Sequence, residues 1–250
     1  MNSRNRALVA LLTIACTVVP ASVAAAKAVR AELRVEGGQK AILDPGTKYK
    51  TDTVTVKSSS KCGPITTNKH TVQGPTALGI VADAATENSN LDPFLVSDTF
   101  GFGLIACEIG DFGSFSASKA WLYKVNHKAP DVGAELFNLA KNDSVLWYFA
   151  NFTTGANTGD ELVLKAPSKV KTGETFQVHV DAYDFAGVKT PAEGVTIAGG
   201  TFGPTDANGV STGKIETSRG FARLRGSRGL EDIPTAPKIV CERGGKKCPE

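Results

Sequence analysis

The sequence predicts a mainly β protein built of two modules, and three observations lead to that prediction. Short stretches in which apolar and polar residues alternate recur along the chain, as in half-buried strands. Gly and Pro supply 26 and 12 of the 250 residues, which provides many turns without a collagen period. Beyond the middle of the chain the strands return about every ten residues, the spacing of an all-β sandwich. With 41% hydrophobic and 21% charged residues, the chain is too apolar to be disordered.

The first 26 residues are expected to be a secretory signal peptide rather than part of the fold. Two arginines precede an apolar run over 7–19, and small residues follow it, with cleavage expected after Ala24 or Ala26. Pro20 ends the apolar run short of the roughly 20 residues that a membrane-spanning helix needs. Lipidation of Cys16 is an alternative, but the Leu that should precede such a cysteine is one place too far back.

The charge that remains argues against a polyanionic partner. Removal of the signal leaves 26 basic and 25 acidic residues, so the mature protein is close to neutral. Nucleic-acid binding is therefore not expected. No second apolar run of membrane length follows, so we expect a secreted protein that does not span the membrane.

Four cysteines follow the signal, namely Cys62, Cys107, Cys241 and Cys248. An even number in an exported chain indicates two disulfides, for which three connectivities are open. Proximity in sequence favours Cys62 with Cys107 and Cys241 with Cys248. A zinc site is not expected, because no two of them form a Cys-x-x-Cys pair.

The first half of the mature chain predicts strands and one short helix. The stretch 29–36 alternates so that one face enters a core and the charged residues face water. A second half-buried strand is expected over 49–57. Helical spacing behind Pro75 predicts a helix over 76–86, although Gly79 weakens the pattern.

The segment 94–115 is rich in Phe and Gly and is expected to form a bulged or twisted strand. Its residues 101–106 superficially fit a dinucleotide-binding fingerprint. No helical pattern follows them and Cys107 ends the run, so the strand is preferred.

The most informative stretch runs from 120 to 149 and predicts two strands between tight turns. The turns are expected at Asn126 and at Asn142-Asp143, because Asn tolerates positive φ. The first strand puts Trp121 and Tyr123 on one face, and the second puts the adjacent Trp147 and Tyr148 on opposite faces.

This stretch resembles a known family on a specific set of positions. The pattern is Trp-x-Tyr-x-Val-Asn, then a Gly, a polar turn and Val-x-Trp-Tyr, carried by Trp121, Tyr123, Val125, Asn126, Gly133, Asp143, Val145, Trp147 and Tyr148. It is similar to the transcobalamin-like C-terminal domain family, a β-grasp module of vitamin B12 carriers and of many exported bacterial proteins. The family usually has Gly where this chain has His127, and Gly-Asp where it has Asn142-Asp143.

The resemblance implies a small β-grasp-like α+β domain over 27–152. In the carriers this module covers one face of the corrinoid together with a large helical domain. This sequence contains no such helical domain, so a corrinoid is not the expected ligand.

A Gly/Thr/Asn-rich linker is expected over 153–160 and a β-sandwich over 161–241, followed by a tail over 242–250. The alternation from Val178 to Asp184 and the later Asp206–Gly209 turn resemble bacterial immunoglobulin-like modules. That resemblance implies an immunoglobulin-like antiparallel β-sandwich, and it implies a fold rather than a function.

No catalytic or metal-binding residues and no cofactor are predicted. His70, His127 and His179 are far apart and are expected in strands or turns. No Gly-x-Ser-x-Gly elbow is present, and the cysteines are expected to be oxidised.

Two carboxylate patterns have structural explanations that we prefer to chemical ones. Asp181 and Asp184 are expected to flank a turn rather than to form a catalytic pair. Asp206 and Asn208 lack the further ligands of a calcium loop and are expected in a hairpin turn.

Two sets of residues are candidate binding groups. Trp121, Tyr123, Asn126, Trp147 and Tyr148 form a hypothetical ring-stacking site if Tyr123 or Tyr148 is exposed beside the Asn126 turn. The basic cluster of Arg219, Arg223, Arg225 and Arg228 lies on or beside an expected exposed strand, where Arg223 and Arg225 are candidates for contact with an anionic surface polymer.

The function predicted from the sequence is therefore that of an exported, non-enzymatic binding or surface-interaction protein. The alternative is a secreted carrier of a small ligand that uses the aromatic face of the first domain. A pocket lined by Tyr123, Asn126 and Tyr148 would favour the carrier, and a closed aromatic core would favour the interaction protein.

Overall fold

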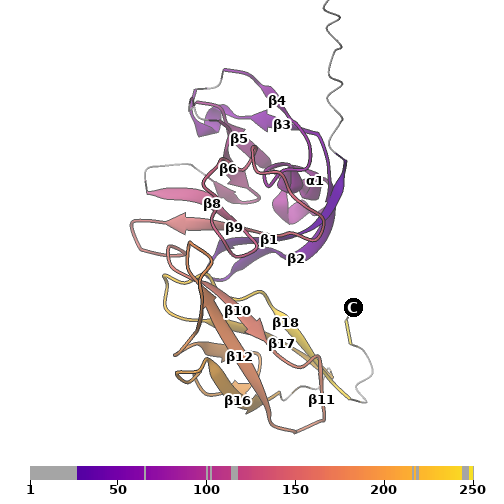
Figure 1. Ribbon diagram of the computed structural model, residues 1–250, viewed down its shortest axis with the longest axis vertical. Coiled ribbons are helices and arrows are strands. Elements are labelled where there is room, and N and C mark those ends of the chain that lie inside the picture. The colour runs from indigo at the N-terminus through magenta and orange to yellow at the C-terminus, as the bar shows by residue number, and fades with distance from the viewer. Residues whose placement is uncertain are drawn as a thin grey trace, which may run out of the picture.

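The computed structural model describes residues 27–64, 66–99, 101, 103–113, 118–215, 217, 220–243 and 248–249. The expected signal peptide over 1–26, with Cys16 and the cleavage positions, lies outside the described residues, as do Phe100, Phe102, Phe115 and Arg219. Strands dominate the described chain, which confirms the mainly β fold class. Figure 1 shows one group of strands above and a second group below, in chain order.

The first half contains two sheets and a short α-helix. One sheet has the strand order β2-β1-β9-β8, and the other has the order β4-β3-β5-β6-β7. Their strands are β1 (Val29–Gly38), β2 (Ala41–Thr51), β3 (Val54–Ser58), β4 (Lys69–Val72), β5 (Phe94–Ser97), β6 (Ile105–Ile109), β7 (Phe112–Gly113), β8 (Lys119–Val125) and β9 (Ser144–Asn151). The helical elements are η1 (Ser60–Cys62), α1 (Gly79–Glu87) and η2 (Ser89–Leu91).

The sheet β2-β1-β9-β8 combines two hairpin-like pairs around a central parallel pairing. β1 runs antiparallel to β2 but parallel to β9, with Glu32 opposite Ser144 and Glu36 opposite Tyr148. Parallel neighbours need a long crossover, and this one contains α1 and the whole second sheet. Helix α1 and one face of the sheet share a core that includes Leu33, Ile80 and Trp147.

Two boundaries differ from the expected ones for local reasons. The helix begins at Gly79 rather than at Thr76: Leu78 is its N-cap residue, and the Thr76 hydroxyl in the preceding turn accepts a hydrogen bond from the Gly79 N–H (2.9 Å). The single strand expected over 49–57 is two strands in two different sheets. The Asp52 carboxylate accepts from the Thr53 N–H (2.8 Å) and makes the bend that separates them.

The second half consists of two sheets around one apolar core. The sheet orders are β10-β12-β16-β15, with β13 also on β12, and β11-β18-β17-β14. The strands are β10 (Glu161–Lys165), β11 (Lys169–Val170), β12 (Phe176–Tyr183), β13 (Lys189–Pro191), β14 (Thr196–Ala198), β15 (Thr201–Phe202), β16 (Val210–Lys214), β17 (Phe221–Ser227) and β18 (Lys238–Glu242). The core between them includes Leu162, Val180, Ile197, Leu224 and Val240.

This sandwich is not wholly antiparallel, because β11 pairs with β18 in parallel. Pro167, which has no N–H to donate to a ladder, separates β10 from β11, and the chain changes sheet there. The remaining strand pairs of this half are antiparallel.

Each half of the chain contains one disulfide. Cys62 of η1 joins Cys107 of β6, and Cys241 of β18 joins Cys248, each with a Cα–Cα separation of 5.8 Å. The structure thus selects, among the three connectivities, the pairing that proximity in sequence favoured.

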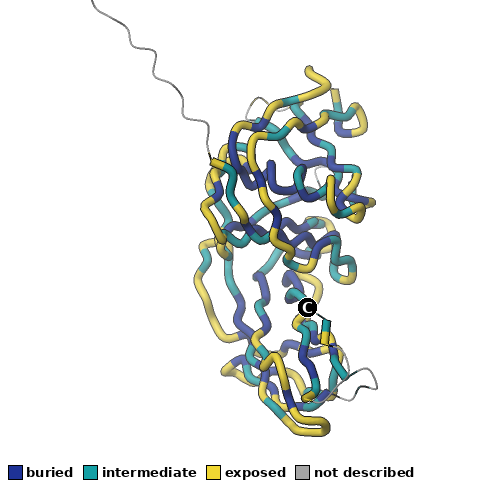
Figure 2. The backbone as a smooth tube through the Cα atoms, turned by 90° about the vertical axis from the view of Figure 1, so that its right-hand side faces the viewer, coloured by how far each residue is buried: buried dark blue, intermediate teal, exposed yellow. Residues whose placement is uncertain are grey.

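The two halves meet over the outer face of the first sheet, the face that does not contact α1. A small buried cluster joins Leu146, Tyr148 and Ala150 of β9 to Ile233 of the second half. Buried segments run through both halves of the backbone in Figure 2. The expectation that every charged residue of 29–36 faces water is wrong, since Arg34 is 7% exposed and Glu36 is fully buried. The second half packs on this face of β1 and shields Arg34 and Glu36 from solvent.

Candidate functional site

The turn after β8 keeps its geometry without a glycine. Asn126 and His127 both have positive φ (50° and 71°), and Val125 and Lys128 bridge across them. The Asn126 side chain donates to Asp143 (2.9 Å) and accepts from the Ser144 N–H (3.0 Å), which ties this turn to the start of β9. Two successive residues with positive φ are typical of a type I′ turn, in which Asn is favoured.

His127 is held in this strained conformation by contacts with the second half. Its ring stacks on Tyr183 with centroids 4.1 Å apart, and its Nδ1 lies 3.0 Å from the Glu161 carboxylate. Left-handed backbone costs a residue with a Cβ about 1–2 kcal/mol. The two contacts offset that cost and keep His127 in this conformation.

The candidate aromatic residues divide between core and surface of the first domain. Trp121 and Trp147 are 4% and 2% exposed, and their indole N–H groups donate to the Phe112 and Ala77 carbonyls. Tyr123 is half-buried, stacks on Trp147 at 5.3 Å between centroids, and donates its hydroxyl to the Val132 carbonyl (2.6 Å). Burial raises the pKa of Tyr123 to about 12.

Tyr148 lies on the opposite face from Trp147, as the strand pattern predicted. It is 1% exposed and packs in the cluster between the two halves. Burial, with a smaller contribution from the Glu161 charge, raises its pKa far above the usual range. Tyr148 is therefore a neutral phenol at any ordinary pH.

A mainly apolar pocket of about 240 Å³ opens beside β8, the edge strand of its sheet. The residues that line it include the four aromatic candidates of β8 and β9, Trp121, Tyr123, Trp147 and Tyr148, of which Tyr123 is the most accessible. Other parts of the wall are made by Leu104, Ile105 and Ala106 and by Ala129, Pro130, Gly133 and Ala134.

The second half also contributes to this pocket through Phe185, which is 45% exposed. Asn126, the fifth candidate residue, does not line the pocket, because its side chain is engaged between the two turns. Of the three residues expected to mark a carrier, Tyr123 and Tyr148 meet at the pocket and Asn126 does not.

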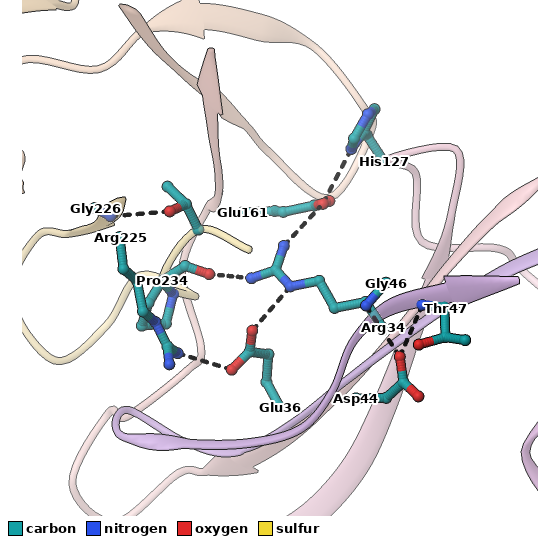
Figure 3. A network of polar contacts seen from close by, with 11 residues as sticks. Arg34, Glu36, Asp44, Gly46, Thr47, His127, Glu161, Arg225, Gly226 and Pro234 are labelled. Atoms are coloured by element: carbon teal, nitrogen blue, oxygen red, sulfur yellow. Dashed lines mark hydrogen bonds and ion pairs between the residues drawn. The ribbon is translucent and has the colours of Figure 1, made fainter. Parts of the chain in front are cut away.

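A buried ionic cluster lies at the junction of the two halves, as Figure 3 shows. Arg34 donates to Glu36 (2.8 Å) and to the Pro234 carbonyl, and it lies 3.8 Å from Glu161. Arg225 donates to the second oxygen of Glu36 (2.8 Å). The cluster thus joins β1 to β10 and β17 across the junction.

The balance between burial and nearby charges differs for the two carboxylates of this cluster. For Glu36, burial outweighs the two arginines and raises the pKa. Burial also favours a higher pKa for Glu161, but the hydrogen bond from His127 and the charges of Arg34 and Lys124 outweigh it, so that the pKa falls below its usual range. The second oxygen of Glu161, Oε2, has no hydrogen-bond partner among the described residues.

The basic residues proposed for surface contact have different environments. Arg223 is exposed, whereas the Arg225 side chain is 18% exposed and paired with Glu36. The view of Arg225 as an outward-facing charge is wrong, because β17 presents this position to the first half. Arg228 is likewise engaged, with Asp232 at 2.6 Å.

The remaining polar candidates occupy structural positions. Asp181 lies within β12 rather than beside a turn, is 2% exposed and pairs with Lys165 at 2.7 Å. Asp184 does lie in a turn, where it accepts from the Val188 N–H (2.8 Å). Asp206 accepts from the N–H groups of Asn208 and Val210 in the expected hairpin turn (both 2.9 Å).

Among the described residues, no three His, Cys, Asp or Glu side chains gather closely enough to hold a metal ion. His70 and His179 lie in β4 and β12, and His127 lies in a turn, as expected. The described helices include none that is long and apolar enough to cross a membrane.

Comparison with known proteins gives a partial family match and a distant structural likeness. Residues 108–151 match a family model described as a domain of unknown function, DUF4430. The matched segment contains β8 and β9 with their four aromatic residues that line the pocket, but not Phe185. No curated protein matches the chain.

Among solved structures, the crystal structure of haptocorrin in complex with Cbi aligns with a TM-score of 0.33 and 12% sequence identity. The alignment covers 50% of this chain and 26% of the haptocorrin chain, so this chain spans about a quarter of that protein's length. A likeness at this level does not establish a shared fold.

Sequence reasoning missed the residues that complete the pocket from outside the aromatic stretch. Phe185 lies in a turn between Asp184 and Gly187 of the second half, and an exposed Phe in a polar turn was the available signal. Lys124, which does not line the pocket but contacts the segment that carries Phe185, was missed as well, because its position between Tyr123 and Val125 is that of an ordinary outward-facing lysine in a half-buried strand.

Proposed function

We propose that this chain is an exported, non-enzymatic binding protein that holds a small aromatic or apolar group in the pocket beside β8. The observation that carries the proposal is the convergence of Trp121, Tyr123, Trp147 and Tyr148 with Phe185 on one pocket of about 240 Å³. Concave, mostly apolar sites with a few polar atoms are the usual form of small-molecule sites. The geometry therefore favours the carrier over a surface-interaction protein with a closed aromatic core.

The size of the pocket limits the ligand. A buried cavity of about 150 Å³ accommodates benzene, so about 240 Å³ suits one substituted ring and not a corrinoid macrocycle. Tyr123, which is half-buried, and Phe185, which is exposed, can offer edge or face contacts to such a group, each worth about 0.5–1.5 kcal/mol beyond burial of area.

Export is supported by the signal-like first 26 residues and by the two disulfides, which persist in oxidising compartments. The transcobalamin-like resemblance of the aromatic stretch agrees with a binding role, although the pocket here is formed by two β modules. The anionic-polymer hypothesis is weakened, since Arg225 and Arg228 already have carboxylate partners.

The direct test is a fluorine NMR titration with fluorobenzene as the probe. We expect the fluorobenzene line to broaden with wild-type protein in a saturable way. Ala129→Phe, which fills the pocket from its loop wall, should weaken the affinity at least tenfold. Ala207→Phe makes the same change in the exposed turn of the second half and should leave the affinity unchanged. No saturable broadening, or equal effects of the two variants, would reject the proposal.

The corrinoid question has its own readout. Both tryptophans of the protein line the pocket, so their fluorescence reports on it directly. We expect no quenching at a defined stoichiometry when cobinamide or cobalamin is added. A stoichiometric transition would show that the pocket opens to admit a much larger ring than its present volume allows.

A further inference from the structure

A turn of the second half lies on the first half beside the pocket. The Ala129 N–H donates to the Phe185 carbonyl (2.9 Å). The Lys124 ammonium group donates to the carbonyls of Tyr183 (2.9 Å) and Asp184 (3.1 Å). The same ammonium nitrogen stands 5.5 Å from the centroid of the Phe185 ring. Lys124 therefore touches three consecutive residues of the turn that supplies the outer part of the pocket wall.

Lys124 occupies an unusual environment for a lysine. The residue is 0% exposed, although it comes from an edge strand. Burial lowers the pKa of Lys124, and the nearby charges of Glu161, Asp160 and Asp184 oppose that change. A buried ammonium group is costly unless its donors are satisfied, and here two carbonyls and a ring face satisfy them.

The position of Lys124 in β8 links these contacts to the pocket. The residues on its N-terminal side, Leu122 and Tyr123, both line the pocket, and Lys124 itself does not. The Lys124 side chain points away from the pocket and binds the segment that carries Phe185. It therefore fixes the distance between β8 and that segment. Within the part of the chain that the structure describes, Lys124 contacts the Phe185 ring and the Ala129 N–H donates to the Phe185 carbonyl, and these two contacts hold Phe185.

We propose that Lys124 is a positioning residue that holds Phe185 at the rim of the pocket, so that ligand binding and docking of the 184–187 turn form one coupled equilibrium. The inference rests on the proposed function and adds how the site is regulated. Coupling of this kind is reciprocal: the factor by which a docked turn raises affinity equals the factor by which bound ligand favours the docked turn.

The test compares four variants by fluorobenzene affinity and by hydrogen exchange of the Ala129 amide, which reports directly on turn docking. Lys124→Met keeps an unbranched apolar stem and removes the donors, and Lys124→Arg restores donors and charge. Phe185→Ala removes the ring. Lys119→Met makes the same change at the start of β8, where no partner for the ammonium group is recorded among the described residues.

We expect Lys124→Met and Phe185→Ala each to weaken fluorobenzene binding about tenfold, a typical size for coupling between sites. The double variant should be no weaker than the worse single one, because both changes act on one contact. Lys124→Arg should recover at least part of the affinity, and Lys119→Met should match wild type. Ala129 exchange should quicken in Lys124→Met, and in wild type it should slow when fluorobenzene is added.

The outcomes separate this inference from the function on which it rests. If wild type binds fluorobenzene and Lys124→Met binds equally well, the positioning role is wrong and the binding function stands. Additive losses in the double variant, or Ala129 exchange that ignores both Lys124→Met and the probe, would also overturn the coupling. If wild type does not bind fluorobenzene, the proposed function fails, and the coupling fails with it.

Discussion

The central part of the sheet β2-β1-β9-β8 is buried on both faces, but by different chemistry. The face toward α1 is a conventional apolar core, in which Leu33, Val35 and Trp147 pack with Ile80. The face toward the second half presents Arg34, Glu36 and Lys124 together with a small apolar cluster around Tyr148. One strand, β1, thus supplies a dry apolar surface on one side and a buried ionic network on the other.

The difference shows how a domain junction is encoded in an ordinary alternating strand. Apolar burial is non-directional, so the α1 face holds the helix and the sheet together but tolerates substitutions by apolar residues of similar volume. The ionic face requires particular partners at particular positions, because an unpaired buried charge is strongly destabilising. We therefore expect the second face to define how the two halves are oriented.

The largest effect is expected from removing the central cation. Arg34→Met should lower the free energy of unfolding by about 3–5 kcal/mol, because Glu36 and Glu161 lose a buried partner. Arg30→Met makes the same change on the same strand face at an exposed position and should stay within about 0.5 kcal/mol of wild type. Urea denaturation followed by tryptophan fluorescence measures both. Equal losses would mean that the ionic face has no special role.

A related variant tests whether apolar residues, as on the α1 face, can replace the buried charges of the other face. Arg34, Glu36 and Arg225 form a triad of paired charges. Combining Arg34→Met with Glu36→Leu and Arg225→Met removes all three charges, so none of them is left without its partner. Replacing a buried ionic group by apolar residues is often neutral or stabilising by about 1–4 kcal/mol, so most of the Arg34→Met loss should be recovered. A triple variant as unstable as the single one would contradict this expectation.

On the α1 face, Leu33→Ala should cost about 2–5 kcal/mol by loss of buried area and creation of a cavity. Val29→Ala, at a half-buried position at the start of the same strand, serves as the control and should cost about 1 kcal/mol or less. The same denaturation measurement applies. If Leu33→Ala also quickened hydrogen exchange at Ile233, whose amide bonds to Asp160 at the junction, the two faces would not be independent.

A smaller effect is expected at the turn that borders the ionic face. His127→Gly relieves positive-φ strain but loses the contact with Glu161 and the stacking on Tyr183. The opposing contributions leave a net loss of about 2 kcal/mol. Asn142→Gly, at a similar φ in an exposed turn, should be neutral or slightly stabilising. Thermal unfolding distinguishes them, and a stabilised His127→Gly would show that docking does not hold His127.

The smallest effect concerns a carboxylate away from the junction. Asp98 accepts from the Thr66 hydroxyl (2.6 Å) and from the N–H groups of Thr66 and Thr67, and these bonds lower its pKa to about 2 despite opposing desolvation. Because the folded pKa is the lower one, this stabilisation is complete above about pH 4 and is lost as the pH falls toward 2.

Melting temperatures between pH 2 and pH 7 test the sign of that effect. Asp98→Asn should melt slightly below wild type at pH 7, and the difference should vanish near pH 2. Asp111→Asn, at an exposed position for which no partner is recorded among the described residues, should follow wild type throughout. A difference that grew on acidification would show that the Asp98 pKa is raised rather than lowered.

Much of the fold followed from local patterns. The strands, the turns at Asn126 and Asn142, and the disulfide pairing favoured by proximity depend on short-range periodicity and spacing, which a sequence shows directly. The short helix was also found, but it begins at Gly79, three residues after the expected start.

The junction between the two halves and part of the pocket could not be predicted from local sequence patterns. Arg34 and Glu36 alternate with apolar residues just as solvent-facing charges do, and only docking of a distant segment distinguishes the two cases. The pocket aromatics were identified because they cluster within 30 residues, whereas Phe185 reaches the site from another module. Contacts between residues so far apart leave no periodic trace in a single sequence.

The central place of β1 has a consequence for the order in which the protein folds. β1 comes first among the described strands, yet its parallel neighbour β9 begins at Ser144, and Arg34 bonds to Pro234, 200 positions further along. Closing such long loops costs conformational entropy, and topologies of this kind fold slowly. β1 can pair with β2 as soon as both are made, but the face that carries Arg34 stays in water until almost the whole chain is available. The charged residues of that face keep it hydrated until then, and Arg34 and Glu36 later form the junction.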